Sequence, residues 1–247
     1  MTVIDLTPTL TPPGRATWLA LRELANVVRI ERWAVVGGQM VAIHAARFGI
    51  TPARPTTDGD IVVDVRAYGR KAMRQIADAL LKLDFVIEMS PEGVTRFVRD
   101  TAKIDLLAPE GVGADVVTSP PGHAVQAPGA TQALERSETV TVRVDDAEFE
   151  VRSPSLIGAI VAKAAATAIP GTRDDRLRHQ QDLAFLLSLA SRSSVRPLTD
   201  SLTTKDRSRL RAALTNWIDD DLHEAWLAVE NHNDVRQLAG ALLRSNP

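Results

Sequence analysis

The chain has 247 residues, 45% of them hydrophobic, and 29 lysines and arginines against 31 acidic residues give a net charge of −2. A chain of this length can bury one large core or two smaller ones, as globular proteins do. It contains no cysteine, which excludes disulfides and thiolate metal sites, so oxygen or imidazole groups would have to hold any metal.

The N-terminal half alternates helical and strand-like hydrophobic patterns. Between the second and third of these elements, Gly37 and Gly38 break a short buried strand before a helical period begins. In chain order we expect a helix over 15–30, a strand over 33–36, a helix over 39–48, a strand over 60–65, a helix over 70–84 and an antiparallel meander over 85–90, 95–100 and 102–109.

The C-terminal half changes from strands to helices near residue 152. Residues 108–134 are rich in glycine, proline and alanine and predict a long loop, and 138–144 with 148–153 predict a hairpin. The remaining pattern predicts helices over 154–168, 175–191, 204–218, 221–231 and 233–245. We therefore expect an α/β (α+β) domain over residues 1–151, with helices flanking a mixed sheet, followed by a helical bundle domain over 152–247.

The apolar run 156–169 is the segment most like a membrane span. Lys163 interrupts it, and it is too short to cross a bilayer. The polar N-terminal residues do not resemble a signal peptide. We therefore expect a cytoplasmic protein without membrane contact.

Lysine and arginine outnumber aspartate and glutamate between residues 152 and 211, whereas the flanking parts are acidic. A basic middle segment is compatible with a phosphate-bearing partner. Solvated helix faces would produce the same pattern.

Asp58 and Asp60 stand at the start of the strand expected over 60–65. Residues two apart in a strand point to the same face, so both carboxylates project together if the strand begins at Asp58 or earlier. A divalent cation commonly relieves the repulsion between such carboxylates. The alternative is a polar turn that leads into the strand.

Asp105 interrupts an otherwise apolar strand, where alternation places Ile104 and Leu106 on the opposite face. If this strand lies next to that of Asp58 and Asp60, the three carboxylates can cluster and bind magnesium ions. The alternative is that Asp105 faces solvent.

Gly37 and Gly38 come between a strand and a helix. Without side chains, their backbone N–H groups and the positive end of the helix can approach a phosphate. The order of strand, glycine pair, helix, Asp-x-Asp and later single aspartate is more informative than the glycines alone.

Residues 35–49 followed by 54–64 resemble the nucleotidyltransferases of the DNA polymerase β superfamily, in particular the AbiEii branch that includes the MenT toxins. That branch shows a glycine turn, a helix and an R-x-T-x-D-x-D pattern, which Arg54, Thr56, Asp58 and Asp60 fit.

Further along the chain, three other positions are similar to motifs of this branch. The strand of Asp105 is similar to the one that supplies the third metal-binding aspartate. Lys163 and Asp182 lie in stretches similar to the downstream lysine motif and its helix. The resemblance implies that Lys163 contacts nucleotide phosphate and that Asp182 supports the site.

The helical residues also have simpler explanations. Lys163 could extend to solvent from an alanine-rich helix. Asp182 follows Arg178 by four residues, the spacing of an ordinary helical ion pair. His179 could contact nucleotide or substrate, but we expect it at the surface, and we expect His44 in a structural role.

These observations lead to the expectation of a Mg²⁺- or Mn²⁺-dependent nucleotidyltransferase. The metal would be bound by Asp58, Asp60 and Asp105, and Asp105 would act as the general base or beside it. Gly37 and Gly38 would bind a nucleoside triphosphate such as ATP. Lys163 and Arg178 would neutralise the charge of its phosphates.

The resemblance further implies a toxin of a toxin–antitoxin pair, with the tRNA 3′ end as acceptor and a cognate antitoxin protein as partner. Two alternatives remain open. One is transfer to a small molecule, as in aminoglycoside nucleotidyltransferases, and the other is a regulatory protein that binds nucleotide without turnover.

Overall fold

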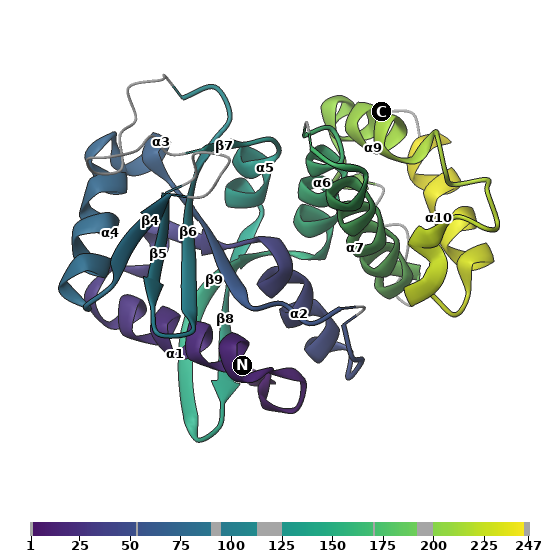
Figure 1. The fold of residues 1–247 in the computed structure, drawn as a ribbon. Coiled ribbons are helices and arrows are strands. Elements are labelled where there is room, and N and C mark those ends of the chain that lie inside the picture. The colour runs from purple at the N-terminus through teal and green to yellow at the C-terminus, as the bar shows by residue number, and fades with distance from the viewer. Residues whose placement is uncertain are drawn as a thin grey trace.

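The computed structural model describes residues 2–52, 54–89, 95–112, 125–169, 171–191 and 200–244. Its fold is mixed α/β, as expected from the sequence: two sheets and their covering helices occupy one side, and the C-terminal helices pack together on the other (Figure 1).

The larger sheet has six strands and carries the acidic residues singled out above. Its path is β2–β3–β6–β5–β4, with β7 parallel to the end of β6. The meander of β4, β5 and β6 is antiparallel as predicted. The strands are β2 (Trp33–Val35), β3 (Asp58–Val63), β4 (Val86–Met89), β5 (Thr95–Arg99), β6 (Ala102–Pro109) and β7 (Val125–Ala127).

One face of this sheet is covered by α1 (Pro12–Val27) and α4 (Lys71–Lys82), and a single large core fills the space between them. Alternation along β3 and β6 supplies the sheet's half of that core. Gly59 is required at the contact with α1, because a Cβ atom there would lie 2.8 Å from Thr17 Cγ2.

The smaller sheet consists of β1 (Ile4–Asp5), β8 (Ser137–Val144) and β9 (Ala147–Pro154), in the order β1–β8–β9. The predicted hairpin is confirmed: Val144 pairs with Ala147, which leaves Asp145 and Asp146 as its two-residue turn. Asp145 adopts a positive φ of 55°, which aspartate tolerates better than most residues.

The predicted loop over 108–134 is wrong at 108–109, 125–127 and 130–134, which are strand or helix, whereas 110–112 and 128–129 are turns and bends; residues 113–124 lie outside the described parts. Strand β7 and helix α5 (Ala130–Glu135) occupy the end of this stretch. Gly129 begins the helix with a φ of 82°, and a Cβ atom on it would lie 2.8 Å from Ala165 Cβ. Close packing of α5 on α6 (Leu156–Ala166), which composition does not reveal, orders this alanine-rich segment.

The C-terminal helices share a second core, to which Met40, Val41 and Ala45 of α2 also contribute. Ser155 caps α6, the first of these helices, as the sequence allowed. The helix expected over 221–231 is only a short 3₁₀ helix, whose Trp226 packs on Trp217 with ring centroids 4.9 Å apart. The bounds are α2 (Gly37–Arg47), α6 (Leu156–Ala166), α7 (Arg173–Ser191), α9 (Thr204–Leu214), η3 (Glu224–Ala228) and α10 (His232–Arg244).

Three short helical turns complete the described elements: η1 (Thr7–Thr9), η2 (Ile30–Arg32) and α3 (Val65–Tyr68). Within the described ranges, no helix combines the length and the apolar character needed to cross a membrane.

Candidate functional site

The three aspartates predicted to cluster lie on one face of two adjacent strands. Strand β3 begins at Asp58 and runs parallel to β6, and Asp60 is the register partner of Asp105. Asp58 and Asp60 share a face because they are two residues apart. Asp105 is only 7% exposed, so the alternative that it faces solvent is wrong.

Arg96 lies among these carboxylates, and the sequence analysis did not identify it. It stands opposite Asp105 in the antiparallel pair of β5 and β6. Its Nε and Nη2 donate to Asp105 Oδ1 and Oδ2 at 2.9 and 2.7 Å, and Nη2 also lies 3.3 Å from Asp58 Oδ2. Alternation offered a signal: Phe97 is buried in the core, so Arg96 had to point to the face that carries Asp105.

Asp60 is the least compensated of the three acids. Burial, together with the negative charges of Asp105 and Asp58, raises the pKa of its carboxyl to about 6, although Lys163 and Arg96 act in the opposite direction. The hydrogen bonds with Asp105 raise the pKa of Arg96 above its usual value. The ionised form of Asp60 is therefore disfavoured unless a further positive charge comes close to it.

The two glycines form the first turn of α2 and do not precede the helix as a break, because Gly37 is already its first residue. Gly37 has a φ of 62°, and a Cβ atom on it would lie 1.7 Å from Asp60 Oδ2. A Cβ atom on Gly38 would lie 2.4 Å from Thr56 Oγ1. The glycines thus let the N-terminus of α2, which has no side-chain cap, approach the aspartates directly.

Asp182 joins two basic residues from distant parts of the chain. Its Oδ2 accepts hydrogen bonds from Lys163 Nζ at 2.7 Å and from Arg54 Nη2 at 2.8 Å. Burial alone would raise the pKa of Asp182, but Lys163 and Arg54 lower it. The carboxylate is therefore ionised and holds both cations in place.

This cluster decides between the alternatives left open for the helical residues. Lys163 is 4% exposed, so its extension to solvent is wrong. The ion-pair partners of Asp182 are Lys163 and Arg54, in place of the helical pair with Arg178 that its spacing suggested. Arg178 is exposed on α7, in the turn of the helix that also carries His179.

A cavity of 190 Å³ opens beside the aspartates. Its lining includes Gly37, Asp60, Lys163 and His179, and most of its other residues are apolar. His179 is partly buried in this lining, which favours contact with a nucleotide or substrate over a surface role. Burial and the charge of Lys163 lower its pKa to about 4, and among the described residues its Nδ1 has no hydrogen-bond partner. A neutral imidazole therefore faces the group that enters this cavity.

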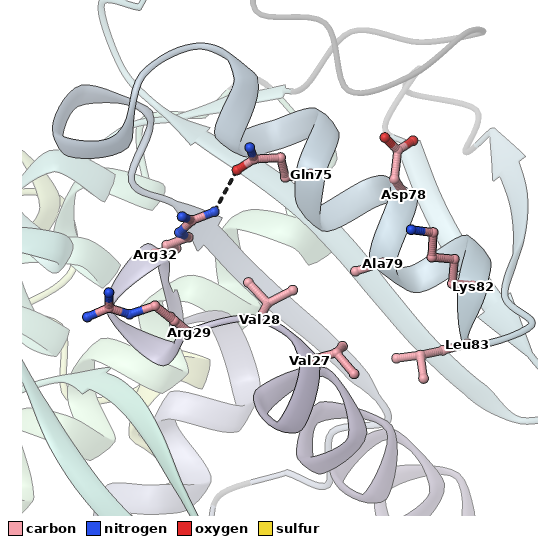
Figure 2. Close-up of a pocket in the computed structure, with 9 residues that line it drawn as sticks. All are labelled: Val27, Val28, Arg29, Arg32, Gln75, Asp78, Ala79, Lys82 and Leu83. Atoms are coloured by element: carbon pink, nitrogen blue, oxygen red, sulfur yellow. Dashed lines mark hydrogen bonds between the residues drawn. The ribbon is translucent and has the colours of Figure 1, made fainter.

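A larger groove of 560 Å³ lies elsewhere, between the C-terminal end of α1, η2 and α4 (Figure 2). Arg32 donates a hydrogen bond to Gln75 at 2.6 Å on one of its walls, and Asp78 is the acidic residue of its lining. It contains none of the site residues predicted from the sequence. The chemistry is therefore better placed at the aspartate cluster.

The chemical character of the cluster suits a divalent cation. Carboxylate oxygens are the ligands that Mg²⁺ and Mn²⁺ prefer. In the described part of the chain, however, no three acidic or histidine side chains are arranged to enclose a metal ion. Arg96 occupies the position between Asp58 and Asp105, so metal binding requires that its guanidinium move.

Comparisons with known proteins give limited information. No protein family and no curated protein sequence matches the chain. It is similar to the crystal structure of an antigenic nucleotidyltransferase-like protein from Paracoccidioides brasiliensis, with a TM-score of 0.47 and 14% sequence identity; the match covers 85% of this chain and 91% of that one. Similarity at this level does not assign a function, which must come from the site.

Proposed function

We propose that the chain is a divalent-metal-dependent nucleotidyltransferase. The observation that carries the proposal is the convergence of Asp58, Asp60 and Asp105 on one face of adjacent parallel strands. The uncapped N-terminus of α2 lies against this face, since Asp60 packs on Gly37. Carboxylates for a metal and free backbone N–H groups for a phosphate are the two requirements of phosphoryl transfer.

In the proposed reaction an acceptor hydroxyl oxygen bonds to the α-phosphorus of a nucleoside triphosphate, the bond from that phosphorus to the bridging oxygen breaks, and pyrophosphate leaves. Asp105 accepts the hydroxyl proton directly or through a neighbouring group. When bound to the three aspartates, Mg²⁺ or Mn²⁺ supplies positive charge for the transferring phosphoryl group and its oxygens.

The basic residues are assigned to the triphosphate. Lys163 lines the cavity beside Asp60, and its contact with Asp182 fixes the ammonium group at that edge. Thr56 lies against Gly38 in the first turn of α2, and Arg54 shares Asp182 with Lys163, so both are assigned to the same phosphate-binding region. Asp182 is then a positioning residue that acts through Lys163 and Arg54.

RNA, with the tRNA 3′ end as the specific case, is the proposed acceptor. The first turns of α7 bring exposed Arg176 and Arg178 next to cavity-lining His179. Exposed arginines attract the negatively charged phosphate backbone of RNA, whereas they repel a cationic aminoglycoside. Such an enzyme would act as the toxin of a toxin–antitoxin pair, with an antitoxin as its protein partner.

The test incubates the protein with Mg²⁺, each labelled nucleoside triphosphate, and either total tRNA or a set of aminoglycosides. We expect label on RNA, and Asp105→Asn should reduce incorporation by about 100-fold or more, because removing a charged ligand of the transition state costs about 3 kcal/mol. Asp78→Asn, an exposed acid on α4, is the matched control and should retain activity.

The other outcomes are equally informative. Label on an aminoglycoside would replace RNA with the small-molecule acceptor and leave the transfer reaction intact. Nucleotide binding without metal and without labelled product in any mixture would contradict the transferase proposal and favour the regulatory alternative.

A further inference from the structure

Arg96 satisfies two of the three carboxylates of the site with one guanidinium group. Its two hydrogen bonds to Asp105 use both carboxylate oxygens, and the same Nη2 reaches Asp58. This two-pronged geometry is the strongest that an arginine makes with a carboxylate. It fixes the orientation of Asp58 and Asp105 relative to each other.

A divalent cation would need the oxygens that Arg96 now engages. Positive charges a few ångströms apart repel each other, and each Arg96 N–H occupies a lone pair that a metal would use. Deprotonation of Arg96 cannot remove this repulsion, because arginine keeps its charge throughout the accessible pH range. Arg96 and the metal therefore compete for Asp58 and Asp105.

The structure leaves room for Arg96 to move. Its side chain is 27% exposed, whereas that of Asp105 is 10% exposed, so the arginine lies at the open side of the pair. Two other basic groups near this site, Lys163 and Arg54, are already held by Asp182. A guanidinium released from the carboxylates would find a new partner in the phosphate oxygens of an entering nucleotide, whose geometry it matches.

We propose that Arg96 is an exchangeable internal cation: it holds Asp58 and Asp105 in the nucleotide-free protein and transfers to the triphosphate when the metal takes its place. The inference rests on the proposed function. It implies that metal and nucleotide bind cooperatively, since each removes the obstacle that Arg96 presents to the other, and such coupling is reciprocal.

The test compares three proteins: the unmodified chain, Arg96→Gln and Arg99→Gln. Arg99 is a matched control because it lies on the same strand β5 but pairs with Glu23, at 2.7 and 3.0 Å. Calorimetry and Mn²⁺ electron paramagnetic resonance give the affinity for Mn²⁺ alone. Calorimetry then gives the affinity for a non-hydrolysable ATP analogue at saturating Mn²⁺.

We expect Arg96→Gln to shift these two affinities in opposite directions. Nucleotide-free Arg96→Gln should bind Mn²⁺ at least about tenfold more tightly than the unmodified chain, since its carboxylates are free. It should bind the analogue in the presence of Mn²⁺ about tenfold more weakly, since a charge-assisted contact with phosphate is lost. Arg99→Gln should behave like the unmodified chain in both measurements.

Unchanged or weaker Mn²⁺ binding by Arg96→Gln would overturn the exchange, because a purely structural arginine predicts a loss in both measurements. Tighter Mn²⁺ binding with unchanged analogue binding would overturn the transfer to phosphate. If all three folded proteins bound neither Mn²⁺ nor the analogue, the proposed function itself would fail. Circular dichroism of each variant establishes that it is folded.

Discussion

His44 shows how a single buried residue sets the response of the protein to pH. It is 1% exposed, and since the carbonyl oxygen of Pro154 can only accept, Nε2 carries the proton in their 2.9 Å hydrogen bond. Burial is the main reason that the pKa of His44 is lowered to about 4; the hydrogen bond with Pro154 opposes this shift and the charge of Arg47 adds to it. The residue joins α2 to the end of β9 in its neutral form, the structural role expected from the sequence.

We predict that this histidine makes the fold less stable in mild acid. Its unfolded pKa is near 6.5, so between about pH 6.5 and 4 the unfolded chain binds a proton that the folded chain does not, and stability falls by up to about 3 kcal/mol as the pH is lowered. Above about pH 6.5 this contribution is constant. Urea unfolding at pH 7.5 and 4.5 should show a smaller loss for His44→Gln; equal losses would contradict the assignment.

At the scale of elements, the site depends on how closely α1 packs on β3. Thr17 Oγ1 donates to Thr57 O at 2.7 Å and accepts from Lys103 N at 3.2 Å, so this helix side chain links the two strands that carry the aspartates. Its methyl group fills the space above Gly59. The glycine between the two acids is therefore a packing requirement of the fold.

We predict that Gly59→Ala destabilises the protein by about 1–3 kcal/mol, because the added methyl group overpacks the contact with Thr17. Thr17→Ser removes the opposing methyl group and keeps the hydroxyl. The double variant should thus be more stable than Gly59→Ala alone, as measured by urea unfolding. If the double variant were less stable than Gly59→Ala by the full cost of Thr17→Ser alone, the close contact with Thr17 would not be the cause of the destabilisation.

At the scale of the whole molecule, Asp182 ties the strand-rich part to the C-terminal helices. It accepts from Arg54, 128 positions earlier in the chain, and from Lys163 on α6. Arg136–Asp206 and Arg209–Glu110, each at 2.7 Å, form further links between these parts. The division into domains at residue 152 stays a prediction, but these ion pairs cross it.

We predict that Asp182→Asn costs about 3–5 kcal/mol of unfolding free energy, because it leaves the buried Lys163 ammonium without a counter-charge. Lys163→Met in the same chain should recover much of that loss, since no buried charge then remains unpaired; Arg54 can turn to solvent. A double-mutant cycle by urea unfolding measures the coupling. Additive costs would show that Lys163 and Asp182 do not stabilise each other.

The sequence by itself determined the local features of this protein. Hydrophobic period places most helices and strands, and because strand residues alternate, it also places Asp58 and Asp60 on one face and Asp105 on a face opposite to Ile104. These properties depend on neighbours within a few positions. They placed the three aspartates on matching faces of their strands, but the pairing of β3 with β6 was needed to bring Asp105 beside Asp60.

Only the tertiary structure decided which side chains meet this cluster. Arg96 between Asp58 and Asp105, the joint contact of Asp182 with Lys163 and Arg54, and the burial of His179 depend on strand pairing and on the docking of α6 and α7. The segments involved are up to 128 residues apart, and local periodicity contains no information about such distant partners. Packing of the whole chain fixes these contacts and, with them, the charge balance of the site.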